Sequence, residues 1–163
     1  MKRITIFTDG SSLGNPGPGG FGTILKFNGN SRELSQGYAR TTNNRMELMA
    51  AIAGLEALKE PCQVTLTSDS KYLVDAMKLG WITGWQKKGW TRGKKKPLKN
   101  ADLWRRLLQA TEGHDISWQW VRGHTGHPEN ERCDELAVNA ASRQNNPPDE
   151  GYQAAGVEEG GVF

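Results

Sequence analysis

The stretch TTNNRMELMAAIAGLEALK, residues 41–59, joins a strong helical pattern to one acidic residue that the pattern does not explain. Apolar residues recur along it at helical spacing and form one face that can pack on a sheet. These residues are Leu48, Ala51, Ile52, Leu55 and Leu58. Thr42, Asn43 and Asn44 carry short polar side chains that can accept hydrogen bonds from the free N–H groups of a first turn. We therefore predict a helix over this stretch.

The unexplained residue is Glu47, which lies three residues after Asn44. That spacing is typical of a capping box, in which the carboxylate only closes the start of the helix. The alternative is that the carboxylate points toward acidic residues on neighbouring strands. The spacing within this stretch does not decide between these two roles of Glu47.

The segments around this helix predict an α/β fold. We predict strands at 3–8, which alternates, and at 19–27 and 32–38, and the short connections between them favour an antiparallel arrangement. After the helix, strand and helix patterns alternate, as is typical of parallel strands. The expected later strands are 63–67 and 115–121, and the expected helices are 72–79, 81–88, 101–111 and 128–143.

Length and composition indicate one soluble domain. The chain has 163 residues, of which 36% are hydrophobic and 24% charged. It contains no apolar run of the roughly 20 residues that a membrane helix needs, and its N-terminus does not read as a signal peptide, so we expect a cytoplasmic protein. Residues 145–163 hold four acidic residues, two prolines and no Lys or Arg, which predicts a mostly flexible acidic tail.

Positive charge is concentrated in one segment. The net charge is +3, but residues 81–106 hold nine Lys or Arg and one Asp, a local balance of +8, so the other residues sum to −5. Trp81, Trp85 and Trp90 are interleaved with these basic residues. Such a segment is typical of a surface that binds a polyanion such as nucleic acid.

Three acidic residues stand where a strand ends or a helix begins: Asp9, Glu47 and Asp69. Asp9 could serve an Asp-Gly turn and Asp69 could cap the following helix. If the strands are adjacent, however, the three carboxylates can meet, and such a cluster implies a cation. Oxygen ligands select Mg²⁺ or Mn²⁺, and paired ions of this kind catalyse phosphodiester hydrolysis.

Several motifs in order resemble those of a bacterial type 1 ribonuclease H, over about residues 3–143. They are TDGSSLGNPGPGGFG, TTNNRMELMAAI, SDS, GWITGWQKKGW, KKKPLKNADLW and VRGHTGHPENERCDELA. The resemblance implies a mixed five-stranded sheet with helices on both faces, a catalytic domain at 1–144 and a basic protrusion at 81–100. It also implies a monomer that hydrolyses the RNA strand of RNA–DNA hybrids by a two-metal-ion mechanism. Mg²⁺ would be the cofactor, with Mn²⁺ possible, and the products would carry 3′-hydroxyl and 5′-phosphate ends.

Carried over by position, the resemblance assigns the metal ligands to Asp9, Glu47, Asp69 and Asp134, and a proton-shuttle or product-release role to His124. Spacing alone does not select Asp134, because the PENERCDELA motif also contains Glu129, Glu131 and Glu135.

The resemblance also implies the residues that hold substrate. The 2′-hydroxyls would meet Ser12, Asn15, Asn43, Asn44 and Glu47, and a DNA phosphate would meet Arg40, Thr42 and Asn100. Lys71 departs from a common amide and could alter the minor-groove contacts. The remaining contacts fall on the basic protrusion, at Trp81, Trp85, Lys87, Lys88, Trp90, Lys94, Lys95, Lys96 and Lys99.

Two other functions stay open at this point. One is a non-catalytic module that binds hybrids through the basic segment, and the other is an integrase-like nuclease on the same fold. The four acidic residues disfavour the first, and the basic protrusion disfavours the second.

Overall fold

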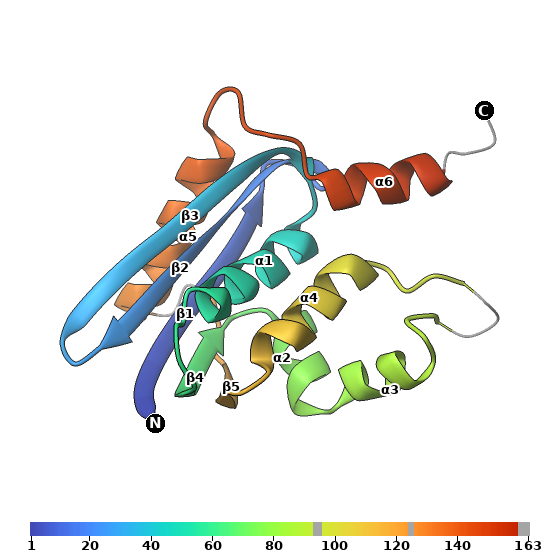
Figure 1. The fold of residues 1–163 in the computed structure, drawn as a ribbon. Helices are drawn as coiled ribbons and strands as arrows, with labels where there is room; N and C mark the ends of the chain where they lie inside the picture. Colours follow the sequence, from blue (N-terminus) through green and yellow to red (C-terminus); the bar gives the residue numbers. More distant parts are fainter. Residues whose placement is uncertain (93–95, 124–125, 160–163) are drawn as a thin grey trace.

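A computed structural model describes residues 1–92, 96–123 and 126–159 of the chain. Its centre is a five-stranded sheet in the order β3-β2-β1-β4-β5 (Figure 1). The strands are β1 (Lys2–Ser12), β2 (Gly17–Phe27), β3 (Asn30–Thr41), β4 (Cys62–Ser68) and β5 (Asp115–Trp120). β2 pairs antiparallel with β1 and β3, whereas β4 pairs parallel with β1 and β5. The predicted mixed sheet is therefore confirmed.

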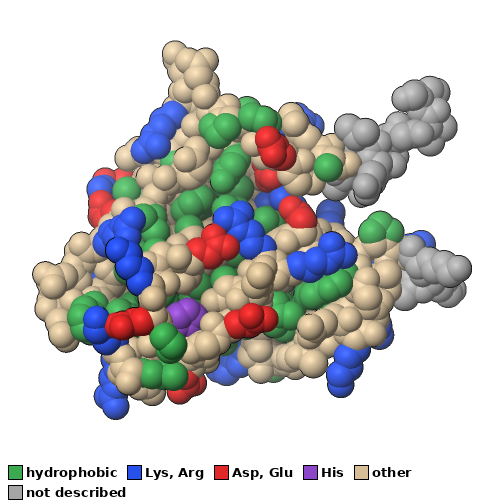
Figure 2. Space-filling model, viewed as in Figure 1, with side chains coloured by type: hydrophobic (Ala, Val, Ile, Leu, Met, Phe, Trp, Pro, Cys, Tyr) green, Lys and Arg blue, Asp and Glu red, His purple; other side chains and the backbone are tan. Residues whose placement is uncertain are grey.

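Helices cover both faces of the sheet, as predicted (Figure 1). They are α1 (Asn43–Glu56), α2 (Lys71–Lys78), α3 (Trp81–Lys87), α4 (Ala101–Thr111), α5 (Pro128–Ala141) and α6 (Glu150–Glu159). α1 lies on one face with α4 beside it, and α5 lies on the other. Over the described ranges, none of these helices has the length and apolar character needed to span a membrane. On the face seen in Figure 2, basic and acidic side chains are interspersed.

Packing fixes α1 and α5 against the central strands. Alternate residues of β1 and β4, such as Ile6 and Leu66, are fully buried in one core with Ile52 of α1. On the opposite face, a Cβ at Gly22 of β2 would lie 2.3 Å from the carbonyl oxygen of Cys133 in α5. Only glycine allows this approach, and because Gly22 pairs with Asp9 of β1, it brings α5 close to that acid.

The C-terminal segment differs from the sequence prediction. A mostly flexible tail was expected at 145–163, but the backbone N–H of Ala39 donates to the carbonyl oxygen of Pro147 at 2.8 Å, and Asp149 is buried. The Asp149 carboxylate accepts hydrogen bonds from Arg45 Nε and Thr41 Oγ1, each at 2.7 Å. Composition shows that this segment is acidic, but it does not show that a buried arginine in α1 needs a counter-charge.

We predict that Asp149→Ala lowers the free energy of unfolding by about 2–4 kcal/mol, because it leaves the Arg45 guanidinium buried with one partner fewer. Asp102 also contacts Arg45, at 2.7 Å, but its side chain is 47% exposed. Asp102→Ala is therefore the matched control, with an expected loss of about 1 kcal/mol or less. Urea unfolding measures both, and equal losses would contradict the structural role of the C-terminal segment.

Candidate active site

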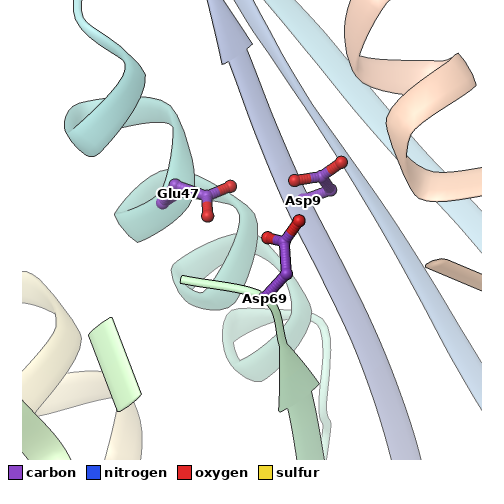
Figure 3. Close-up of side chains that lie close together, drawn as sticks. All are labelled: Asp9, Glu47 and Asp69. Carbon is purple, nitrogen blue, oxygen red and sulfur yellow. The ribbon is translucent and has the colours of Figure 1, made fainter. Parts of the chain in front are cut away.

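Three carboxylates meet where β4 ends beside β1 and the start of α1 (Figure 3). Asp9 lies in β1, Asp69 directly follows β4, and Glu47 lies near the start of α1. The β1–β4 register pairs Thr8 with Ser68, which sets the two aspartates side by side. One oxygen of each carboxylate lies within 4.8 Å of the others.

The simpler local roles of these acids do not hold in the structure. Asp9 lies inside β1, paired opposite β2, so it does not form a turn. The N-cap of α1 is Thr42, whose hydroxyl accepts the N–H three residues on at 3.3 Å, so Glu47 does not close a capping box with Asn44. The helix after Asp69 is capped by Ser70 instead.

Gly10 brings two of the acids together. Its backbone N–H donates to the Asp9 carboxylate at 3.0 Å and also to the Glu47 carboxylate. A Cβ at Gly10 would lie 2.4 Å from the backbone nitrogen of Glu47, so any other residue would push α1 away. The sequence suggested only a turn at Asp-Gly, and nothing in its pattern revealed this close approach.

The acids are strongly coupled by charge. Burial raises the pKa of Asp9 to about 8, and repulsion from Asp69 and Asp134 adds to the effect. Burial, with repulsion from Asp9 and Asp69, also raises the pKa of Glu47 well above its usual value. The cluster therefore cannot be fully ionised at neutral pH unless a cation compensates it.

Asp134 is the acid of α5 that joins this cluster. It lines the same pocket, of about 460 Å³, as Asp9, Glu47 and Asp69. The other acids of its motif are placed elsewhere, because Glu129 pairs with a lysine, Glu135 pairs with an arginine and Glu131 is exposed. The structure therefore distinguishes Asp134 from the three glutamates of its motif, which sequence spacing could not do.

Several residues expected to contact 2′-hydroxyls border the same pocket. Asn43, Asn44 and Lys71 line it, and the side-chain oxygen of Asn15 accepts the N–H of Asn43 at 3.1 Å. Ser12 is the last residue of β1 and follows Ser11, which lines the pocket. Sequence reasoning missed further lining residues, for which the neighbouring motifs were the only signal: Ser11, Ser70 and Tyr72.

Two of the residues expected to hold a DNA phosphate, Thr42 and Asn100, contact Arg45. Asn100 accepts a hydrogen bond from Arg45 Nη1 at 3.4 Å and donates one to the Tyr72 hydroxyl at 3.2 Å. Thr42 caps the helix that carries Arg45. Arg40 is exposed two residues earlier in the chain, near the end of β3.

The tryptophans of the basic segment differ in burial. Trp81 is 45% exposed, whereas the Trp85 ring lies 5.0 Å from that of the fully buried Trp104, and Trp90 is also half-buried. These two rings therefore also support the core, which the sequence prediction of a binding surface did not include. Four lysines of the segment are exposed: Lys87, Lys88, Lys96 and Lys99. Lys94, Lys95 and His124 lie outside the described residues.

Comparisons with known proteins agree with this site. The family model RNase H matches residues 1–142. A ribonuclease H of Shewanella baltica is 58% identical over 153 residues, covering 94% of this chain and 97% of that protein. The crystal structure of LC9-RNase H1, described as a type 1 RNase H with the type 2 active-site motif, matches with a TM-score of 0.80 at 36% identity, over 90% of this chain and 75% of that one. LC11-RNase H1 in complex with RNA/DNA hybrid matches with a TM-score of 0.66 at 26% identity, over 85% and 96%.

Ribonucleases H generally depend on divalent metal ions, and a cluster of three carboxylates is compatible with that chemistry. The family model extends over the whole sheet and through α5, so it includes all four acids of the pocket. Sequence, fold and site therefore agree that the chain belongs to the ribonuclease H family and is a ribonuclease H of the bacterial kind.

Proposed function

We propose that this ribonuclease H is an endonuclease that hydrolyses the RNA strand of RNA–DNA hybrids and leaves 3′-hydroxyl and 5′-phosphate ends. The observation that carries the proposal is the meeting of three carboxylates within 4.8 Å, beside Asp134 and next to two exposed amide side chains, Asn43 and Asn44. The hybrid bound to the similar LC11-RNase H1 supports the choice of substrate.

The donor set fits divalent ions. Carboxylate oxygens are the ligands that Mg²⁺ and Mn²⁺ prefer, and Asp9, Glu47, Asp69 and Asp134 would hold these ions. The raised pKa values of Asp9 and Glu47 indicate a cluster that lacks positive charge. Two bound ions would supply an activated water and stabilise the leaving oxygen of the phosphodiester.

The protein's own groups hold the acids in place. The Gly10 N–H fixes one oxygen of Asp9 and one of Glu47. Ser70 caps α2 with its own hydroxyl, which leaves the carboxylate of Asp69 free for the pocket. These fixed positions spare the acids from reorganising during the reaction.

Recognition of RNA falls to groups that can both donate and accept. The amides of Asn43 and Asn44 fit a 2′-hydroxyl, which is exposed in the shallow minor groove of a hybrid. His124 would move a proton or assist product release. Gly123, just before it, approaches Asp69 so closely that a Cβ would lie 2.8 Å from Oδ2, so this loop begins at the pocket.

Contacts with the sugar–phosphate backbone of the hybrid would come from the basic segment and the phosphate site. The exposed lysines of residues 87–99 and the exposed face of Trp81 suit the DNA strand, with Lys94 and Lys95 extending the same charge. Lysine is a point charge without base specificity, so these contacts would position the hybrid without reading its sequence. Arg40, Thr42 and Asn100 would hold a DNA phosphate. We expect the protein to act as a monomer.

The direct test is incubation of an end-labelled RNA–DNA hybrid with the protein and Mg²⁺. We expect internal cleavage of the RNA strand, fragments with 5′-phosphate and 3′-hydroxyl ends, and no cleavage of DNA or RNA duplexes of the same sequence. Chelation with EDTA should stop the reaction. Tight binding of the hybrid without cleavage would instead support a non-catalytic binding module, and cleavage of duplex DNA would support an integrase-like nuclease.

A second prediction concerns Asp9→Asn. Hydrolysis should fall by about 1,000-fold or more, because metal ligation stabilises the transition state by several kcal/mol. The metal-free variant should nevertheless be about 1–2 kcal/mol more stable at pH 7, because folding then no longer has to protonate or bury a carboxylate beside Asp69 and Asp134. Glu131→Gln, which alters an exposed acid of α5, is the control and should change neither quantity.

The raised pKa of Asp9 also predicts that the stability of the metal-free protein depends on pH. Since the Asp9 pKa is about 8 in the native protein and about 4 in the unfolded chain, the native state binds more protons between these values. The stability of the metal-free protein should therefore fall as pH rises from about 4 to 8, and less steeply in Asp9→Asn. Identical pH profiles by urea unfolding would argue against crowding of the carboxylates.

Another prediction concerns the basic segment. The double variant Lys87→Ala/Lys88→Ala should raise KM with little change in kcat. It should also reduce the slope of log binding constant against log salt by about 1–2, because each phosphate contact releases counterions. Lys59→Ala removes an exposed charge after the far end of α1 and should alter neither value. An unchanged slope in the double variant would exclude a docking role for these lysines.

A further inference from the structure

Lys71 is a cation at the carboxylate pocket that pairs with none of its acids. It is the first residue of α2 and lines the pocket with Asp9, Glu47, Asp69 and Asp134. In the part of the chain that the structure describes, its ammonium forms no ion pair with these four acids. It lies instead 4.7 Å from the centre of the Trp120 ring.

The Trp120 ring is anchored to the strand and turn that carry Asp69. Trp120 is the last residue of β5 and pairs in parallel register with Ser68 of β4. Its indole Nε1–H donates to the backbone carbonyl oxygen of Asp69 at 3.0 Å. The next residue, Val121, donates its N–H to the carbonyl oxygen of Ser68, also at 3.0 Å. The indole is therefore hydrogen-bonded to Asp69, and the backbone after it is bonded to Ser68, although Trp120 is 40% exposed.

The position of the Lys71 ammonium on the ring, rather than among the acids, requires a physical explanation. Lysine is a point charge on a flexible four-carbon stem, so a cluster of crowded carboxylates would attract it. An ammonium inside the cluster would occupy the oxygens that a divalent ion needs. The face of an indole offers an alternative, since it attracts cations, and the Trp120 indole is hydrogen-bonded to the backbone of Asp69, which lines the pocket.

We propose that Trp120 is a positioning residue that holds the Lys71 ammonium at the rim of the pocket. The four carboxylates stay open to divalent ions, and the ammonium faces the phosphate backbone of the substrate. The inference rests on the proposed function, because it concerns the same acids and the same ions. The proposed role of Trp120 concerns the binding of the ion rather than hydrolysis, so it can be tested by measuring metal affinity alone.

The test is calorimetric titration of the full-length protein with Mn²⁺. Trp120→Leu should weaken Mn²⁺ binding by about two- to fivefold, the range expected when a surface cation–π contact is lost. Trp120→Phe keeps an aromatic face but removes the Nε1–H donor, and its affinity should stay within about a factor of two of the parent. In a Lys71→Gln background, Trp120→Leu should have no further effect, because no ammonium remains to enter the pocket.

An equal loss in the parent and in the Lys71→Gln background would overturn the proposal, because Trp120 would then act through the Asp69 turn. Loss in Trp120→Phe as large as in Trp120→Leu would overturn it for the same reason. Parent protein that binds no Mn²⁺ would refute the proposed function itself, and with it this inference.

A measurement on the unaltered protein covers the case in which Trp120→Leu fails to fold. Ring currents from Trp120 should shift the side-chain Hε protons of Lys71 upfield of those of the exposed Lys59 in NMR spectra. Lys71→Gln identifies the resonance by its disappearance. Equal shifts for the two lysines would show that the ammonium does not rest on the ring.

Discussion

Repulsion among buried carboxylates is the interaction on which the rest of this structure depends. Asp9 and Glu47 share the single N–H of Gly10, and burial with mutual repulsion raises the pKa of both acids. Such an arrangement persists only if the surrounding structure imposes it. Here the parallel pairing of β1 with β4 sets Asp9 beside Asp69, and the packed core beneath α1 keeps Glu47 against both. The fold thereby maintains a site that favours a divalent ion.

The helix that carries Glu47 also carries a buried cation, and this links the C-terminus of the chain to the site. Arg45 lies two residues before Glu47 and is paired with Asp149 and with Asp102 of α4. It also contacts Asn100, one of the residues proposed to hold a DNA phosphate. The segment around Asp149 thus supports the start of α1 from the side opposite the carboxylates, rather than forming a separate tail.

Sequence periodicity was sufficient for most of the fold, because hydrophobic alternation and helical spacing reflect burial directly. Periodicity did not predict the features that depend on contacts between residues distant in sequence. The Asp9-Gly10 pair suggested a turn, but the glycine admits α1 while the strand continues to Ser12. Spacing alone did not distinguish Asp134 from the nearby glutamates. The packing of α5 on Gly22 fixes the face of the helix that meets the pocket, and Asp134 lies on that face. The burial of Asp149 and the contact of Lys71 with Trp120 have no local signal at all.

We propose that four acids from four separate segments form one site for divalent ions. A crystal soaked in Mn²⁺ and measured at the manganese absorption edge tests this claim most directly. We expect anomalous density among the carboxylate oxygens of Asp9, Glu47 and Asp69, with Asp134 alongside. Manganese bound only elsewhere on the protein, with this pocket left empty, would contradict it.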